Sequence, residues 1–462
     1  MSATLPRPRS ASEPRTAIPG PTGNPLLGSA LALRGDLLGT LQEGFARYGD
    51  VVAYRVGPAR GPRGQQRTIV AVQHPDDLRR VMVETDVFVR RTPSHDVVRE
   101  LFGETIVTME GERWRRQKRI LQPLFTRRHV AQYAGLLETE ADRVAEHWRD
   151  LGVQEFDIMQ AVEQHALRVL GQTIFAQEDL IDDVTAAALE RLVPRLGEQV
   201  AERVTQALRM PLYMPTPRNR RFRALRAELR ETIERVLAQR ERDRRGGASD
   251  LLGRLRDARD PQDGAALPQR EVRDEALMFM LAGYTTTADV MIAALHLLGS
   301  HPDLQERVAA SACGPAGGDE ELVQATLREA MRLYPPSYAL GRRAMADTEL
   351  GGHPVPAGAL VLVVPWATHR DPRFWPDPER FDPGRFVGEH DRPPFAYMPF
   401  GGGARACIGR HVAMLESRTM IRALLQRYRI ESLDAKLPLS QLMSMRPLGP
   451  VRVRLHPRGA AA

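Results

Sequence analysis

The chain has 462 residues, of which 42% are hydrophobic, so it is long enough to bury a large core. Its formal net charge of +7 lies mostly along helical faces instead of in a stripe with interleaved aromatic residues, which argues against nucleic-acid binding. It has only two cysteines, Cys313 and Cys407. A disulfide framework therefore does not fit a chain of this length, and a reducing compartment, the cytoplasm, is expected.

The N-terminal residues 1–24 are rich in proline and arginine and predict a mostly extended surface arm. They contain no sustained apolar run, so neither a signal peptide nor a membrane anchor is expected there. Length alone suggests about three domains. However, the polar stretches 244–248 and 314–319 are short enough to be loops. We therefore expect a single domain, residues 25–462, behind the arm.

Helical periodicity dominates the rest of the chain. Apolar residues recur on one face of the segments Leu136–Leu151, Thr185–Ala207, Arg220–Arg242, Glu271–Leu298, Leu322–Tyr334 and Ile408–Tyr428. Alternation typical of strands is confined to Val51–Val56, Thr68–Val72, Leu360–Val364 and Val451–Leu455. The sequence therefore predicts a mainly α fold with a small β portion.

The stretch Ala276–Leu298 is apolar enough to raise the question of a membrane span. Asp289, His296 and the threonines at 285–287 interrupt it, and such polar groups are costly in lipid. A buried helix that crosses the protein interior fits better. Because threonine hydroxyls can bond back to the preceding turn, the threonines and Gly283 predict a polar notch in an apolar wall.

One cysteine stands inside an unusual segment, Phe400-Gly401-Gly402-Gly403-Ala404-Arg405-Ala406-Cys407-Ile408-Gly409. A cysteine that follows a glycine turn and precedes a helix can present its sulfur to backbone N–H groups, which favour a metal-ligating thiolate. The glycines let a flat cofactor approach the main chain, and Phe400 would keep the metal's surroundings dry. The alternative is a structural cysteine buried beside a glycine turn.

The segment fills every fixed position of the pattern F-x-x-G-x-R-x-C-x-G and closely resembles the haem-binding loop of the cytochrome P450 monooxygenases. The resemblance implies haem b, with Cys407 as the ligand of its iron. Phe400, Gly401 and Gly409 would lie against the cofactor, and Arg405 would reach a carboxylate at its edge. It also implies the P450 fold, in which a long central helix crosses over the haem.

The notch in the apolar helix resembles the family's oxygen-binding groove, with Ala282 and Gly283 against the cofactor. By this resemblance, Thr286 would hydrogen-bond dioxygen or an ordered water and help deliver the protons that break the O–O bond. Relatives generally carry Asp or Glu at the position of Thr285. We therefore expect Thr285 and Thr286 to act in a relay of hydroxyls and waters, with slower turnover or wasted peroxide as possible costs.

The segment Gly111–Arg119 resembles the helix that holds the haem propionates. Trp114 and Lys118 are one turn apart, so an indole N–H and a cation can converge on one carboxylate. Relatives mostly have Arg or His in place of Lys118, and the alternative is a basic surface helix. Arg342 is a further propionate candidate by resemblance, with its neighbour Arg343 as the rival.

Glu329 and Arg332 are three residues apart on a predicted helix, where an isolated pair would be a solvated salt bridge. The downstream segment Phe381–Phe386 resembles the family's partner for this pair. The resemblance implies a structural network of Glu329, Arg332 and Arg385.

The resemblance implies a haem-thiolate monooxygenase that uses dioxygen, because a thiolate ligand favours O–O cleavage. No flavin or iron–sulfur region is evident, so electrons would come from a separate ferredoxin or flavodoxin with its reductase. A basic patch is expected to steer that partner, formed by Arg115, Arg116, Arg119, Arg405 and Arg410. We expect a monomer that has no membrane span and does not bind nucleic acid.

Aliphatic and aromatic residues are common in the segments expected to line the substrate pocket, 93–108, 180–215, 279–283, 337–340 and 442–444. They predict a lipophilic substrate such as a terpenoid, a fatty acid or a polyketide. Two other hypotheses remain open. A peroxide-driven or rearranging haem-thiolate enzyme would need no electron donor, and a non-catalytic haem sensor would have little use for the threonine groove.

Overall fold

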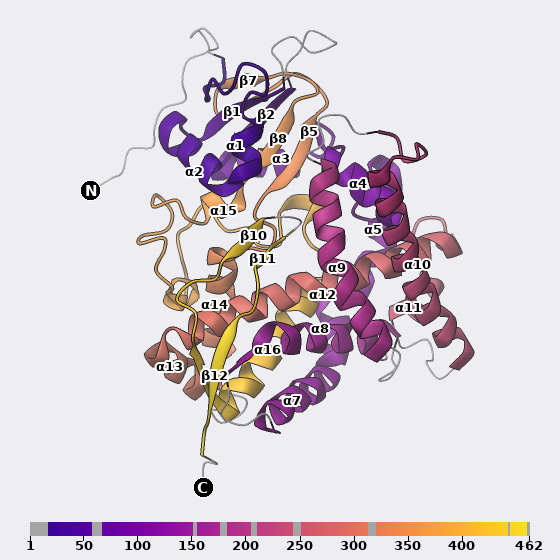
Figure 1. Ribbon diagram of the computed structural model, residues 1–462, viewed down its shortest axis with the longest axis vertical. Coiled ribbons are helices and arrows are strands. Elements are labelled where there is room, and N and C mark those ends of the chain that lie inside the picture. The colour runs from indigo at the N-terminus through magenta and orange to yellow at the C-terminus, as the bar shows by residue number, and fades with distance from the viewer. Residues whose placement is uncertain are drawn as a thin grey trace.

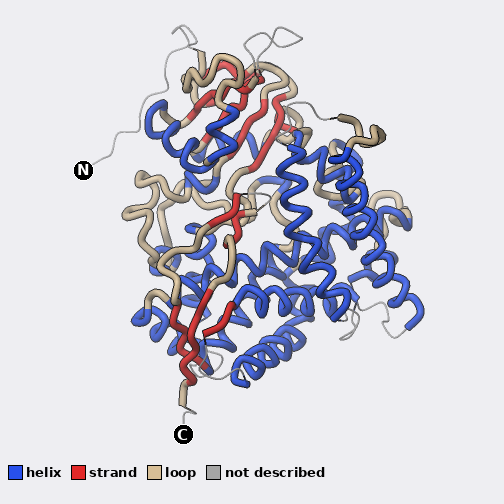
Figure 2. The backbone as a smooth tube through the Cα atoms, viewed as in Figure 1, coloured by secondary structure: helices blue, strands red, loops and turns tan. Residues whose placement is uncertain are grey.

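The computed structural model describes residues 17–57, 67–150, 155–175, 183–204, 210–243, 251–312, 320–441 and 444–459. Helices fill most of the molecule, and a small sheet lies at the end where the chain begins (Figure 1). Figure 2 shows further short strands along one flank of the helical body. The predicted fold class, mainly α with a small β portion, is confirmed.

The helices predicted from periodicity are all present, with ends shifted by a few residues: α7 (Ala134–Asp150), α9 (Asp183–Val204), α10 (Pro217–Asp243), α12 (Gln269–Gly299), α14 (Glu320–Leu333) and α16 (Arg410–Arg427). The structure adds α1 (Ala30–Gly35), α2 (Leu37–Tyr48), α3 (Pro75–Val83), α4 (Pro93–Phe102), α5 (Gly111–Leu121), α6 (Arg127–Val130), α8 (Ile158–Phe175), α11 (Leu251–Asp257), α13 (Pro302–Ala312) and α15 (Pro365–Thr368).

The main sheet has five strands in the order β1 (Val51–Val56), β2 (Arg67–Val72), β8 (Leu360–Val363), β5 (Leu340–Ala344) and β3 (Phe88–Val89). Only β2 and β8 run parallel within it. Shorter sheets join β4 (Glu155–Asp157), β12 (Arg452–Pro457) and β9 (Tyr428–Ser432), then β6 (Thr348–Leu350) and β7 (His353–Val355), and β10 (Leu439–Gln441) and β11 (Met445–Pro447).

The described part of the predicted arm, residues 17–24, lies against β1. Ile18 is buried, and the Ala53 N–H donates a hydrogen bond to the Pro19 carbonyl at 2.8 Å. The rest of the arm and Cys313 lie outside the described residues.

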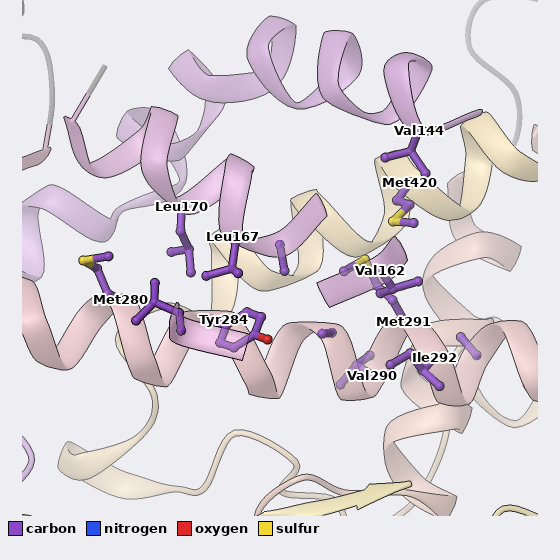
Figure 3. Close-up of a cluster of buried hydrophobic side chains, with 14 of the residues drawn as sticks. Val144, Val162, Leu167, Leu170, Met280, Tyr284, Val290, Met291, Ile292 and Met420 are labelled. Atoms are coloured by element: carbon purple, nitrogen blue, oxygen red, sulfur yellow. The ribbon is translucent and has the colours of Figure 1, made fainter. Parts of the chain in front are cut away.

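The helix α12 is the centre of the largest apolar core. In Figure 3, Tyr284 of α12 lies opposite Leu167 and Leu170 of α8, and Val144 of α7 and Met420 of α16 extend the same cluster. A Cβ atom on Gly283 would come within 2.9 Å of the Leu170 side chain. Glycine at this position therefore lets α8 lie close to the central helix.

By length and composition α12 could cross a membrane, but 72% of its most apolar stretch is buried inside the molecule. Its polar residues have partners in the fold. The Ser444 hydroxyl donates to Asp289 at 3.1 Å, and His296 Nδ1 lies 2.8 Å from the Ser432 hydroxyl. These contacts fit the core helix that the sequence predicts.

Glu329 and Arg332 of α14 form an ion pair that has no exposed surface. Two hydrogen bonds join them, Nε to Oε2 at 2.7 Å and Nη2 to Oε1 at 2.8 Å. Arg385 approaches Oε1 of Glu329 at 3.4 Å, and Arg332 also donates to the His369 carbonyl at 2.8 Å. The structure therefore brings the predicted network together and connects α14 to the loops that precede the cysteine segment.

Candidate functional site

A cavity of about 720 Å³ lies inside the molecule beside α12. Its wall combines residues from distant parts of the chain, among them Trp114, Lys118, Ala282, Thr286, Phe400 and Cys407. Residues that the sequence singled out separately thus line one cavity.

The cysteine segment folds as a tight loop just before α16. The Cys407 N–H donates to the Phe400 carbonyl at 2.8 Å, which closes the loop on itself. Gly401 and Gly403 have φ values of +70° and +63°, a region that side chains disfavour. A Cβ atom on Gly403 would also lie 2.5 Å from the Met82 carbonyl oxygen. Glycine is therefore required where this loop lies against α3.

The Cys407 sulfur is exposed to the cavity, while protein surrounds it on its other sides. Burial raises the pKa of the thiol above its ordinary value, and hydrogen bonds from the Gly409 and Arg410 backbone N–H groups lower it. Burial is the larger effect. The two amides therefore favour the thiolate, as the sequence predicts, but burial outweighs them in the protein alone. A coordinated metal cation removes such a proton.

Trp114, Lys118 and Arg405 meet at one edge of the cavity. The guanidinium of Arg405 lies 3.8 Å from the centre of the Trp114 ring and donates to Glu110 at 2.7 Å. Lys118 Nζ donates to the Ala404 carbonyl at 2.7 Å. Trp114 is only 6% exposed, whereas Lys118 is partly exposed, so the alternative of a basic surface helix does not describe Trp114 but fits the outer side of α5.

The neighbours Arg342 and Arg343 have opposite surroundings. Arg343 is partly exposed and donates to the Arg91 and Gly358 carbonyls. Arg342 is 2% exposed, and its Nη2 lies 3.4 Å from the Met82 sulfur. Met82 lines the cavity, whereas Arg342 behind it does not. Burial lowers the pKa of Arg342 well below its usual range, and the charges of nearby arginines lower it further.

Arg90 is a cavity residue that the sequence analysis missed. Its Nη2 donates to the Arg405 carbonyl at 2.8 Å, and its Nε is buried without a hydrogen-bond partner among the described residues. Its backbone N–H donates to Glu110 at 2.8 Å. No motif marks Arg90, because its role depends on the contact between β3 and the cysteine loop.

The cations at this edge outnumber the acid that contacts them. Glu110 faces Arg90, Arg342 and Arg405, while burial and the charge of Arg90 lower the pKa of Arg405 to about 10. Burial and the charge of Arg405 also lower the pKa of Lys118. A ligand with carboxylates at one edge and a metal ion near the sulfur fits this distribution. Haem b is such a ligand.

On the α12 side, Ala282, Gly283 and Thr286 line the cavity as predicted. The Thr286 hydroxyl donates to the Ala282 carbonyl at 2.7 Å, and the helix continues without a break. Thr285 is partly exposed and is not on the cavity wall. The structure therefore brings only Thr286 of this predicted catalytic pair to the cavity.

Only some of the segments that were expected to line the substrate pocket contribute residues to the cavity wall. Ile106, Val107, Phe279, Ser337 and Leu340 line the cavity. Within 183–204 and 210–215, the residues whose side chains the structure describes contribute none of the wall. Residues 176–182, 205–209 and 442–443 lie outside the described part of the chain.

Comparison with known proteins gives the family. The Cytochrome P450 profile matches residues 18–453. The chain belongs to the cytochrome P450 family. This P450 is 31% identical to the cyclooctat-9-en-7-ol 5-monooxygenase of Streptomyces melanosporofaciens over 458 residues, which cover 96% of both chains. It is also 31% identical to the putative cytochrome P450 132 of Mycobacterium tuberculosis over 412 residues, 84% of this chain and 87% of the relative.

Solved structures agree with this assignment. The structure of retinoic acid-bound cyanobacterial CYP120A1 matches with a TM-score of 0.81 at 25% identity, over 96% of this chain and 100% of that one. The P450 is therefore a haem b-dependent monooxygenase, as the sequence predicts.

The excess of buried positive charge predicts opposite effects of one substitution on the haem-free and haem-loaded protein. Arg342→Met removes a cation that is buried beside Arg90 and Arg405 and shares Glu110 with them, so we expect a higher melting temperature without haem. With haem, loss of the positive charge should weaken retention of the carboxylate-bearing cofactor. Thermal unfolding of both forms and haem transfer to apomyoglobin measure the two effects. Arg343→Met is the matched control. It loses the hydrogen bonds to the Arg91 and Gly358 carbonyls, so it should neither raise the melting temperature nor weaken haem retention. A less stable haem-free Arg342→Met protein would contradict the prediction.

Proposed function

We propose that this P450 oxidises a lipophilic small molecule, with Cys407 as the ligand of the haem iron. The observation that carries the proposal is the single cavity in which the Cys407 sulfur, the Thr286 hydroxyl and a cation-rich edge are all present. A structural cysteine would have no reason to face an open space of this kind.

Each part of the cavity has a task toward the cofactor. When bound, haem supplies the activation of dioxygen and the transfer of an oxygen atom to a C–H bond. The amides of Gly409 and Arg410 hold the sulfur in place. We propose that Lys118, Arg405 and the missed Arg90 bind the carboxylates of the cofactor. Arg342 lies behind Met82, and its positive charge would stabilise the carboxylates without contacting them.

Thr286 is the hydroxyl that we propose for proton delivery. Its own proton is directed to the Ala282 carbonyl, so its oxygen remains able to accept a hydrogen bond from a water molecule in the cavity. Because Thr285 is not on the wall, it cannot contact the reacting atoms directly. We propose a purely structural role for the network of Glu329, Arg332 and Arg385.

The proposed substrate is hydrocarbon-rich, and a terpenoid is the first choice ahead of a fatty acid or a polyketide. The wall residues Ile106, Val107, Phe279 and Leu340 offer apolar contacts. Relatives in Streptomyces melanosporofaciens are named cyclooctat-9-en-7-ol 5-monooxygenase and cyclooctatin synthase, and a solved relative binds retinoic acid. These names favour a role in secondary metabolism.

The electron donor that we propose is an acidic ferredoxin or flavodoxin with its reductase. The docking patch that we propose keeps Arg410 of the predicted patch but not the rest, because Arg405 is buried and Arg115, Arg116 and Arg119 each lie within 4 Å of an acid. Arg127 and Arg410 are exposed, and their charges lower the pKa of His411 between them, although burial is the larger cause. No ion pair joins either arginine to an acid in the described part of the chain. Unpaired cations on a surface steer an acidic partner.

We further propose that residues 25–462 act as one domain behind the arm of residues 1–24 and that the protein is a cytoplasmic monomer. In the described chain, the one helix apolar enough to span a membrane is α12, which is mostly buried.

Loss of the thiolate ligand tests the central assignment. Wild-type protein loaded with haem, reduced and exposed to carbon monoxide should show the red-shifted Soret band of a thiolate-ligated haem. Cys407→Ala should lack this band, because the band requires a thiolate and Cys407 is the cysteine that faces the cavity among the described residues. A panel of terpenoids, fatty acids and polyketides should then include compounds that shift the wild-type spectrum to high spin. A wild-type protein that binds haem through another side chain would contradict the proposal.

A pair of isosteric substitutions separates the two threonines. Thr286→Val should reduce the product formed per NADPH by about tenfold or more and increase the release of hydrogen peroxide, because general acid–base groups contribute at least this much. Thr285→Val should leave the yield nearly unchanged, since its side chain is off the wall. Product and peroxide are measured in the same reactions. Equal losses in the two variants would contradict the assignment to Thr286.

Charge reversal tests the docking patch. Arg127→Glu should slow reduction by an acidic ferredoxin several-fold at low salt and weaken the dependence of the rate on ionic strength. Arg223→Glu is the control, because Arg223 is equally exposed but lies on α10 and does not line the cavity. Stopped-flow reduction measures both variants. Equal rates for Arg127→Glu and wild type would count against this docking surface.

A further inference from the structure

Glu275 is a buried acid on α12 that has no role in the chemistry described above. It has no exposed surface and lies about three turns before Thr286. Its Oε1 accepts a hydrogen bond from the Ile106 backbone N–H at 2.5 Å and another from the Gln117 side-chain amide at 2.8 Å. Its Oε2 is buried and has no hydrogen-bond partner among the described residues. One oxygen atom therefore joins α12, α5 and the loop between α4 and α5.

The loop that Glu275 holds forms part of the cavity wall. Ile106 and Val107 line the cavity. Within the loop, the Thr108 hydroxyl donates to the Gly103 carbonyl at 3.0 Å and accepts from the Thr105 N–H at 2.9 Å. These bonds give the loop a fixed shape, but they do not fix its distance from α12. The hydrogen bond from the Ile106 N–H to Glu275 joins the loop directly to α12, beside the apolar packing of Ile106 and Val107 against the core.

Arg405 holds the same loop from the side of the cysteine segment. Its Nη1 donates to the Met109 carbonyl at 2.9 Å and approaches the Ile106 carbonyl at 3.4 Å. The Ile106 residue is therefore held through its N–H by the central helix and through its carbonyl by the cysteine segment. Gln117 precedes Lys118 on α5, so Glu275 also fastens the helix at the charged edge of the cavity.

The charge state of Glu275 suits a purely positional role. Burial raises the pKa of its carboxyl to about 8, and Glu271 and Asp274 on the same helix add to this, against the hydrogen bonds from Gln117 and Ile106. On the α5 side, Arg113 lies 3.8 Å from Glu271. At neutral pH the carboxyl is therefore protonated, and it offers an acceptor oxygen without placing a charge beside the apolar wall.

We propose that Glu275 is a positioning residue that holds Ile106 and Val107 in the wall of the substrate chamber, the part of the cavity in which the substrate would bind. It thereby determines the affinity of the chamber for a bulky apolar ligand. The inference rests on the proposed function, since it specifies how this P450 shapes its substrate site. It assigns to Glu275 no contact with haem or substrate.

Two azoles on the haem-loaded protein test this proposal. Imidazole and 4-phenylimidazole both bind haem iron through a ring nitrogen, but only the second places a phenyl ring in the chamber. The measured quantity is the ratio of their dissociation constants, obtained from absorption titrations. Glu275→Met removes the acceptor at similar volume and leaves two buried donors unpaired, so the preference for 4-phenylimidazole should fall about tenfold. Imidazole affinity should change little.

The conservative variant separates positioning from bulk stability. Glu275→Gln keeps an acceptor oxygen for Ile106 and Gln117 and should retain the wild-type ratio within about twofold. Glu271→Gln is the control on the same helix and should also retain the ratio. Glu271 contacts Arg113, which pairs with Glu104 of the loop, but the substitution leaves the acceptor for Ile106 in place. An unchanged ratio in Glu275→Met, or an equal loss in Glu275→Gln, would overturn the proposal.

A further variant covers the case in which Glu275→Met does not load haem. Glu275→Asp keeps the acceptor but withdraws it by about 1.5 Å, the length of one C–C bond. The ratio should then fall, and a wild-type ratio would overturn the proposal. Azole binding needs no turnover, so failure of this inference leaves the proposed oxidation intact. Conversely, a wild-type protein that binds azoles with the expected ratios but oxidises nothing would contradict the proposed function alone.

Discussion

The site depends on one constraint, the closure of the glycine loop that presents the Cys407 sulfur to the cavity. The hydrogen bond from the Cys407 N–H to the Phe400 carbonyl and the positive φ values of Gly401 and Gly403 determine where the sulfur lies. The protein surroundings raise the pKa of the thiol in spite of the two amides that donate to it. Burial thus favours the thiol in the protein alone, and a metal cation is the partner that would make the thiolate stable where the sulfur faces the cavity.

The same principle applies to the charged edge of the cavity. The charges of Arg90 and Arg405 lower the pKa of Arg342, and Arg90 lowers that of Arg405, while Glu110 accepts hydrogen bonds from both Arg90 and Arg405. Burying like charges together is costly unless an anion completes the group. The Cys407 sulfur thus favours a metal cation, and the buried arginines favour an anion. A single cofactor with a metal centre and edge carboxylates supplies both.

The central helix organises the walls around this cofactor site. Its Gly283 admits α8 at close range, its Asp289 receives the Ser444 hydroxyl beside β11, and its Glu275 holds the loop of Ile106. Each of these contacts fixes the position of a different chain segment relative to α12. This arrangement explains why polar residues occur in a helix that is otherwise apolar enough for a membrane.

The sequence alone determined the features that are local in the chain. The cysteine loop was recognisable because ten consecutive residues carry it, and α12 and α16 because their apolar faces repeat over many turns. The helix α8 was missed because residues on nearly all of its sides are buried, including His165 and Gln172, so its sequence shows little contrast between faces. Only the tertiary structure decided the rest. Arg342 and Arg343 are adjacent in β5 and point to opposite faces, and the sequence does not say which face is inside. Glu275 and Arg90 acquire their roles from segments that are distant along the chain, since local patterns carry no information about contacts that form only when the chain folds.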